Sequence, residues 1–240
     1  MPTYTFGKRT GATYQNNHKD TSVNKGSRAN NSKAGDQNIN ASAYNGDPTG
    51  WILMRFDLPD IPAGETIDSA TLKVICQSAP PSTVTIDVHE VVTPYGVTDT
   101  NEGSSESPAT GGQATFDRAK DYAGGGGDVE WATFYPLTSR YDFGSSDYDA
   151  SVMDSFQVLS TDTGTEFEID VTDYVTNVHG GGTNAGIVML HNDGSGAVGF
   201  WIWSQDAGTA ANRPLLTVET SVAATGIVVP FQIFKPQGVF

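Results

Sequence analysis

Apolar and polar side chains alternate through two neighbouring stretches near the middle of the chain. In the first stretch apolar residues occupy every second position, at Ile52, Met54 and Phe56, and a second alternation runs over residues 70–76. Successive side chains of a β-strand point to opposite faces, so a period of two predicts a half-buried strand. Residues 59–64 separate the two patterns with two prolines and a glycine, which are typical of a turn. We therefore expect two strands joined by a short polar connection.

Similar short alternations recur along the rest of the chain. They predict strands near residues 83–92, 155–160, 165–169, 187–190, 199–204 and 215–220, with weaker strands near 10–15 and 39–44. Roughly eight to ten short strands without a regular alternation of strand and helix are typical of antiparallel sheets packed face to face. We expect an all-β fold, an antiparallel β-sandwich or jelly roll. It forms one domain over residues 1–222, with 1–10 as a candidate N-terminal arm and 223–240 as an apolar C-terminal extension.

One short helix is predicted at residues 171–179. Four apolar residues have the spacing of a single buried helix face, namely Val171, Tyr174, Val175 and Val178. Asp170 is placed to cap the N-terminus of this helix, and the glycines at 180–182 are placed to end it. A helix this short does not persist alone, so we expect it to pack on the sheet.

The composition excludes several classes of partner. The formal net charge of −15 disfavours a nucleic-acid backbone, and the basic residues near 8–33 are dispersed among asparagines. Cys76 is the single cysteine, so no internal disulfide forms, and its strand position predicts a buried thiol. The most apolar segment, 222–234, is too short to span a membrane and contains Pro230. We expect neither nucleic acid nor membrane as a partner.

Three blocks of sequence carry a family resemblance. The first is LMRFDL at 53–58 with IP at 61–62, Ile67 and SATL at 69–72. The second is IDVT at 169–172 with Val175 and NAGI at 184–187, and the third is Phe200 with SQD at 204–206 and RPLLTV at 213–218. With the ATF element at 114–116 and Gly127-Asp128, these blocks resemble the DNRLRE-type β-sandwich family over about residues 13–222. That family is related to carbohydrate-binding modules and disaggregatase-associated domains.

The resemblance implies a jelly-roll domain without catalysis, of a kind found on cell-surface proteins, polysaccharide-active proteins and phage virions. The residues themselves also disfavour an enzyme. The four histidines are widely separated in sequence and none has the helical spacing of a metal site: they are His18, His89, His179 and His191. Gly194-Ser195-Gly196 lacks the flanking pattern of a nucleophile elbow. We expect no enzymatic activity and no catalytic residues.

Trp201 and Trp203 are the aromatic residues that point most directly to a ligand. If Phe200 and Ile202 face the core, the pleat places both tryptophans on the outer face. Aromatic planes spaced along a strand can stack on the apolar faces of sugar rings. The alternative is that a loop, a second layer or another subunit covers the two rings.

A structural calcium ion is a second candidate ligand, and no other cofactor is expected. Oxygen ligands for it are offered by Asp99, Asn101 and Glu102 in one loop and by Asp128 after the glycine run. No complete ligand loop is present in the sequence at either place. Solvated acidic loops are the alternative interpretation.

The apolar C-terminal extension predicts attachment to another chain. Its candidate docking residues are Val229, Phe231, Ile233, Phe234 and Phe240. We expect a homo-oligomer, or binding to other proteins of a larger assembly. Taken with the resemblance, this predicts a structural or recognition module on a bacteriophage virion surface, as a capsid decoration or tail component. The alternative is a polysaccharide-binding module of an extracellular or cell-surface protein.

Overall fold

A computed structural model describes residues 1–14, 18–24, 38–44, 47–58, 61–93, 130–132, 134–135, 140–141, 143–191 and 198–222. The strands are β1 (Thr3–Phe6), β2 (His18–Asn24), β3 (Asn38–Tyr44), β4 (Asp47–Phe56), β5 (Glu65–Ser78), β6 (Val84–Glu90), β7 (Phe134–Tyr135), β8 (Arg140–Tyr141), β9 (Asp154–Val158), β10 (Glu166–Asp170), β11 (Ile187–His191), β12 (Val198–Trp203) and β13 (Leu215–Val222). The helices are α1 (Thr172–His179) and a 3₁₀ turn, η2 (Ala210–Asn212).

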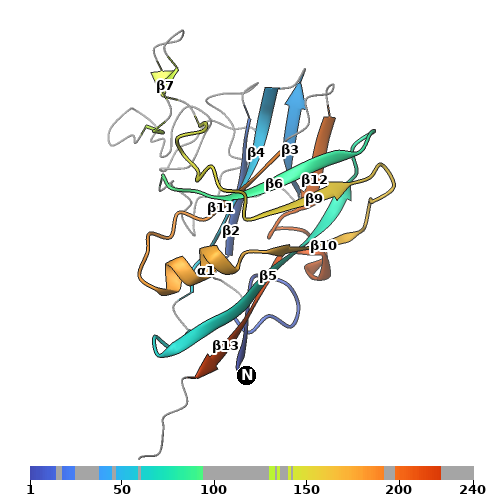
Figure 1. Cartoon of the computed structure of the whole chain (residues 1–240). Coiled ribbons are helices and arrows are strands. Elements are labelled where there is room, and N and C mark those ends of the chain that lie inside the picture. The colour runs from blue at the N-terminus through green and yellow to red at the C-terminus, as the bar shows by residue number, and fades with distance from the viewer. Residues whose placement is uncertain are drawn as a thin grey trace, which may run out of the picture.

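The all-β sandwich predicted from the sequence is confirmed. Eleven of the described strands form one antiparallel sheet, and β7 and β8 pair separately. The large sheet curls into two layers, which Figure 1 shows crossing one another. The β5 layer consists of β1, β13, β5 and β10. The β4 layer consists of β12, β3, β4, β2, β11, β6 and β9.

β5 connects the two layers because it is long enough to pair within both. Along its 14 residues it pairs with β13, then with β10, and finally with β12 through Cys76 and Ser78. Its alternation breaks once, because Ile67 and Ala70 are both buried although they lie three residues apart. A register shift explains this: Glu219 and Thr220 of β13 pair with Ser69 and Ile67, which leaves Asp68 as an extra residue in β5. The bulge returns the next apolar side chains to the core face.

The main core lies between the two layers. It contains the apolar positions predicted in the two central stretches, together with side chains from most other strands: Ile52, Met54, Phe56, Leu72, Val74, Cys76, Ile86, Val88, Ile169, Met189, Phe200, Ile202, Leu216 and Val218. The expected buried thiol of Cys76 is confirmed, with 0 % exposure. β4 and β5 follow one another in sequence but lie in different layers, so their apolar faces meet across this core.

A second apolar cluster covers part of the outer face of the β4 layer. Trp51, Leu53, Val188 and Leu190 contribute from β4 and β11, and Trp131 and Phe143 cover them from a segment of little regular structure. The indole of Trp131 meets the Phe143 ring edge-on, with centroids 4.8 Å apart. β11 is therefore buried on both faces, as its uninterrupted apolar sequence predicts.

α1 is observed where it is predicted, with one correction at its start. The N-cap position is Val171, so the expectation that Asp170 occupies it was wrong by one residue. The Asp170 carboxylate instead accepts hydrogen bonds from the Thr172 amide at 2.9 Å and from the Thr172 hydroxyl at 2.6 Å. It still satisfies one of the amides that a helix start leaves without a partner. None of the helices in the described part of the chain is long and apolar enough to cross a membrane.

Two further sequence predictions need correction. The weak strand near residues 10–15 is only an isolated bridge between Phe6 and Tyr14. The strands also outnumber the expected eight to ten. β2, β7 and β8 show no alternation of apolar side chains, and β1 alternates over only four residues, TYTF. β1 belongs to the residues expected as a candidate N-terminal arm, and it pairs with β13.

Tyr174 fastens α1 to the end of β4. Its hydroxyl donates to Asn184 Oδ1 at 2.8 Å and accepts from the Phe56 amide at 3.3 Å. The side-chain amide of Asn184 donates in turn to the Phe56 carbonyl at 2.7 Å. Because the hydroxyl is buried, the pKa of Tyr174 is raised and the group stays protonated. These contacts satisfy backbone groups at the point where the β4 ladder ends.

We predict that Tyr174→Phe lowers the free energy of unfolding by about 1–3 kcal/mol, because it leaves buried partners without a hydrogen bond. Urea denaturation monitored by tryptophan fluorescence measures the loss. Tyr14→Phe is the matched control, since the Tyr14 ring stacks on Phe6 at 4.9 Å and its hydroxyl bonds to no described residue. Equal stability of the two variants would contradict the anchoring role of Tyr174.

Candidate functional site

Trp201 and Trp203 lie on the outer face of β12. Phe200 and Ile202 are fully buried in the main core, so the pleat turns the two tryptophans to the other side. Both indoles are half-buried. The outward orientation expected from the alternation is therefore present in the structure.

Polar side chains lie next to the two tryptophans across the sheet. Trp201 is in register with Asn40 of β3 and with Ser78 of β5, and Trp203 is in register with Asn38 of β3. A residue and its register partner point to the same face of a sheet, so the indoles and these amides share one side of it. Asn38 is half-buried there, and Asn40 is only 6 % exposed. We call these four residues, Trp201, Trp203, Asn38 and Asn40, the β12 outer face.

The Trp201 ring lies back along its own strand, over Gly199. A Cβ atom at Gly199 would come within 3.3 Å of the indole Nε1. This is closer than side chains usually approach, so the absence of a side chain at Gly199 gives the indole room to lie along the strand. A ring held in this way presents a broad apolar surface with a polar N–H edge.

Aromatic planes beside amide groups suit a particular class of ligand. A sugar ring offers apolar C–H faces for stacking and hydroxyls that bond to amides, and a protein partner can offer similar groups. Trp51, by contrast, lies on the same layer under Phe143 and is only 6 % exposed. Covering by an irregular segment is thus observed for Trp51, whereas Trp201 and Trp203 are half-buried.

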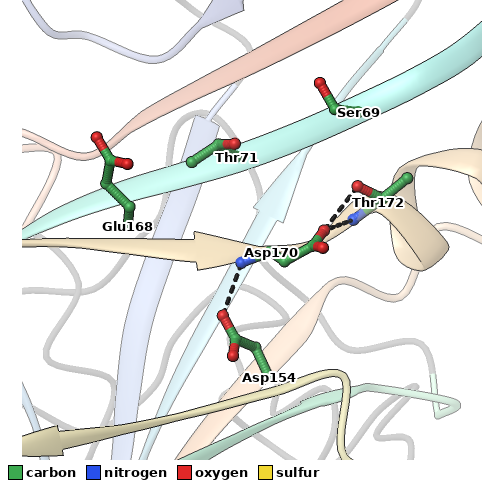
Figure 2. A pocket seen from close by; sticks show the side chains of 6 residues that line it. All are labelled: Ser69, Thr71, Asp154, Glu168, Asp170 and Thr172. Carbon is green, nitrogen blue, oxygen red and sulfur yellow. Dashed lines mark hydrogen bonds between the residues drawn. The ribbon is translucent and has the colours of Figure 1, made fainter.

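A shallow depression of about 250 Å³ lies where the two layers approach each other at β9 and β10 (Figure 2). It is lined by Ser69, Thr71, Asp154, Glu168, Asp170 and Thr172. No ladder joins β9 to β10; the Asp154 carboxylate instead accepts the backbone N–H of Asp170 at 2.8 Å. The rings of Phe156 in β9 and Phe167 in β10 also contact one another, with centroids 5.0 Å apart. We call this junction the β9–β10 seam.

The charges at the seam are largely committed to structural contacts. Asp170 bonds to Thr172 at the start of α1, and Asp154 bonds across the seam. Lys73 lies 2.6 Å from Glu168 and 3.4 Å from Glu166, and its hydrogen bond to Glu168 raises the pKa of the lysine. The depression thus resembles a solvated structural joint more closely than a set of groups free to act as acid and base.

The other sequence-predicted site residues lie outside the described residues. They are the calcium candidates Asp99, Asn101, Glu102 and Asp128, and the extension residues Val229, Phe231, Ile233, Phe234 and Phe240. Among the residues that the structure describes, no group of three or more histidine, cysteine or acidic side chains is arranged to hold a metal ion.

Sequence analysis missed two polar arrangements that the structure brings together. One is the β9–β10 seam, which joins residues far apart in the chain. The other is a buried cluster around His18 and Asp20 of β2, whose side chains face the core. β2 has the sequence HKDTSVN, and so its inward positions carry no apolar signal. Only the pairing of β2 with β4 reveals that these side chains are buried.

We predict that Asp154→Ala lowers the free energy of unfolding by about 0.5–1.5 kcal/mol, because the Asp170 amide loses its acceptor. Asp154→Asn retains one side-chain oxygen as an acceptor and should lose less. Urea denaturation gives the ranking, and hydrogen exchange of β10 localises the effect. If Ala and Asn proved equally stable and β10 remained equally protected, the bond across the seam would have no structural role.

Comparisons with known proteins do not assign the chain to a family. No protein-family model matches the chain, and no curated protein matches it. The resemblance to the DNRLRE-type β-sandwich family therefore stays a prediction from the sequence. What the candidate surfaces can do follows from the contacts of their own residues.

Proposed function

We propose that the protein is a non-enzymatic structural and recognition module of a larger assembly, with a bacteriophage virion surface as its setting. Its sandwich is the recognition body, and the C-terminal extension attaches that body to neighbouring chains. A capsid decoration or a tail component would both use the protein in this way. The virion setting is supported by the family resemblance.

The observation that carries the proposal is the contrast between the sandwich edges and the extension. The outer edge of β1 is occupied, since the Gly7 amide donates to the Tyr14 carbonyl and the Tyr14 amide donates to the Thr5 carbonyl. At the other edge, β10 is bridged to β9 through Asp154 and Asp170. An additional strand thus finds few open ladder positions in the β5 layer.

The sequence that follows β13 carries several large apolar residues. β13 ends at Val222, which is 65 % exposed, and the sequence continues with Val229, Phe231, Ile233 and Phe234. Each large apolar side chain gains roughly 1.5–3 kcal/mol when it is fully buried. Pro230 and Pro236 cannot donate to a ladder, which disfavours a central strand and favours an extended arm. A neighbouring chain is the better acceptor for such an arm.

The placement of the ionisable groups supports a role without catalysis. In the β9–β10 seam Asp154 and Asp170 bond to backbone amides and Glu168 pairs with Lys73. His18 and Asp20 are buried inside the core. Neither the seam nor the His18–Asp20 pair places an acid and a base next to one another at an exposed position without structural partners. An acid–base mechanism needs both properties at a position that a substrate can reach.

We predict that deletion of residues 224–240 leaves a folded, soluble body that no longer assembles. Light scattering coupled to size-exclusion chromatography compares the masses of the two proteins, and circular dichroism compares their folds. Replacing Gln232 and Gln237 with serine changes the same segment without removing apolar surface, and this control should still assemble. A full-length protein that stays monomeric at high concentration, or a truncated one that fails to fold, would contradict the proposal.

The alternative function, a polysaccharide-binding module of an extracellular or cell-surface protein, is favoured by the β12 outer face. There the half-buried indoles of Trp201 and Trp203 share one surface with Asn38 and Asn40. This arrangement suits stacking on sugar rings, with hydrogen bonds from the half-buried Asn38 amide to the hydroxyls, whereas Asn40 is only 6 % exposed. The same surface could serve the virion module as its recognition face for a surface glycan.

For this alternative we predict that Trp201→Ala and Trp203→Ala each weaken glycan binding about fivefold or more, as expected for the loss of one stacked ring. A glycan array identifies a ligand, and calorimetry then measures the affinities. Val92→Ala is the control, because Val92 is also exposed, at 50 %, and follows β6, which pairs with β11 and β9 and not with β12. Tryptophan variants that unfold or change oligomeric state would show instead that the rings are packing residues.

A further inference from the structure

His18 and Asp20 are ionisable residues placed inside the sandwich. β2 pairs with β4 so that His18 is in register with Phe56 and Asp20 with Met54, and both partners belong to the main core. The side chains of His18 and Asp20 are 0 % and 1 % exposed. The His18 ring stacks flat on Phe56, with centroids 4.4 Å apart and an interplanar angle of 7°. Two potential charges are thus removed from water.

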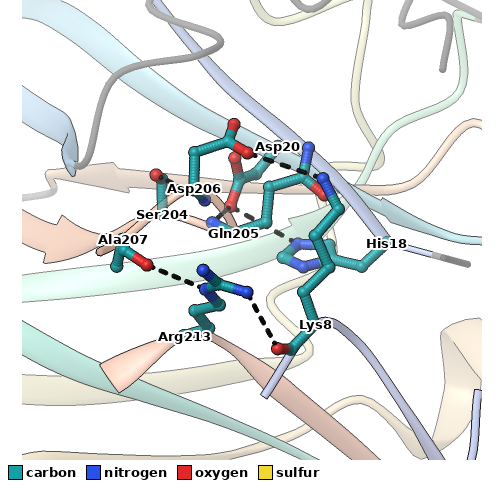
Figure 3. A network of polar contacts seen from close by, with 8 residues as sticks. All are labelled: Lys8, His18, Asp20, Ser204, Gln205, Asp206, Ala207 and Arg213. Atoms are coloured by element: carbon teal, nitrogen blue, oxygen red, sulfur yellow. Dashed lines mark hydrogen bonds and ion pairs between the residues drawn. The ribbon is translucent and has the colours of Figure 1, made fainter. Parts of the chain in front are cut away.

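Few hydrogen bonds compensate for this burial. Asp20 Oδ2 accepts the backbone N–H of Gln205 at 2.7 Å, and the same oxygen lies 3.6 Å from His18 Nε2 (Figure 3). Asp20 Oδ1 and both ring nitrogens of His18 have no hydrogen-bond partner among the described residues. A distance of 3.6 Å is too long for a direct hydrogen bond, so the contact compensates neither charge fully.

The charged groups around the pair come from two other segments. Lys8 follows β1, and its ammonium lies 3.5 Å from the Asp206 carboxylate in the turn after β12. Arg213 bonds to the carbonyls of Ala207 and Lys8, which holds the two segments together. Arg9 is engaged elsewhere, at 2.7 Å from Glu166 of β10. Lys8 and Asp206 are therefore the charges that act on His18 and Asp20.

The environment favours the uncharged form of each group. Burial lowers the pKa of His18 to about 3, and the positive charge of Lys8 acts in the same direction. Burial raises the pKa of Asp20 to about 8, with the Gln205 amide and Lys8 opposing the shift and Asp206 adding to it. At neutral pH the two groups together then hold one ionisable proton, carried by the carboxyl group.

We propose that the His18–Asp20 pair is an alkaline-sensitive latch, in which loss of its one proton releases the turn at 204–207 and the adjoining Lys8–Arg9 segment from β2. An ionised Asp20 keeps the hydrogen bond from the Gln205 amide and is attracted by Lys8, but burial is the larger effect and the charge of Asp206 adds to it. The net result is an unfavourable buried charge. Water can reach the new charge only if one of the two covering segments moves away. Those segments are joined by Arg213 and Lys8, so they are expected to move together.

The direction of the pH dependence follows from the two shifts. The folded pKa of Asp20 lies above the ordinary value of 3.8, so its contribution to stability is complete below 3.8 and is lost as the pH rises through about 8. The folded pKa of His18 lies below the ordinary 6.5, so its contribution is present above 6.5 and is lost as the pH falls through about 3. Above pH 6.5 only the Asp20 effect remains, and stability falls with rising pH.

The test compares the wild-type protein with Asp20→Asn, which cannot ionise. Between pH 7 and pH 9 the folded-to-unfolded ratio of the wild type should fall about tenfold relative to that of the variant. Above pH 8, the amides of residues 1–13 and 204–207 should exchange hydrogen faster in the wild type than in the variant measured at the same pH. Asp68→Asn, which changes an exposed carboxylate bonded to Ser221, should behave as the wild type does.

Identical pH dependence of the wild type and Asp20→Asn would overturn the latch. If the variant does not fold, the amide resonance of Gln205 in the wild-type protein decides the question. It should titrate with a midpoint near 8, because its acceptor is the ionising carboxylate. A resonance that does not change between pH 6 and pH 9 would also overturn the proposal.

Discussion

The pairing of β5 within both layers is the constraint on which the rest of the structure depends. One strand of 14 residues bonds to β13 and β10 in its own layer and to β12 in the other. The curl of the sheet follows from this double pairing, and so does the main core that the curl encloses. The bulge at Asp68 keeps the apolar side chains of β5 on the core face along the whole strand. The core-facing side of β12, and hence the outward direction of Trp201 and Trp203, is set by the same pairing.

Where backbone ladders end, side chains complete the sandwich. Tyr174 and Asn184 satisfy Phe56 at the end of β4, and Asp154 bridges β9 to β10 where no ladder forms. The pair of His18 and Asp20 differs from these joints, because it is buried with few hydrogen bonds. Rigid joints and a poorly compensated polar cluster therefore coexist in the described part of the chain. The cluster is the place where a change of protonation can affect the arrangement of the strands.

The sequence predicted those elements whose apolar side chains follow a regular period. The alternations of β4, β5 and β12 and the helical spacing around Tyr174 all correspond to observed elements. β2 could not be predicted in this way, because the side chains it turns inward are polar and are recognised as buried only through β4. The covering of Trp51 by Trp131 and Phe143 was equally hidden, because single aromatic residues in an irregular segment carry no periodic signal. The division of β4 and β5 between two layers depends on long-range pairing that the local pattern does not contain.

The occupied edges of the β5 layer and an apolar extension together form the physical basis of the proposed assembly role. A photo-reactive benzoylphenylalanine placed at Phe231 tests that role most directly, because it reports what the extension touches in the intact protein. The account predicts covalent products of at least twice the monomer mass, with the cross-link mapped by mass spectrometry to a second chain. Cross-links that form only within one chain, between position 231 and its own sandwich, would contradict the account.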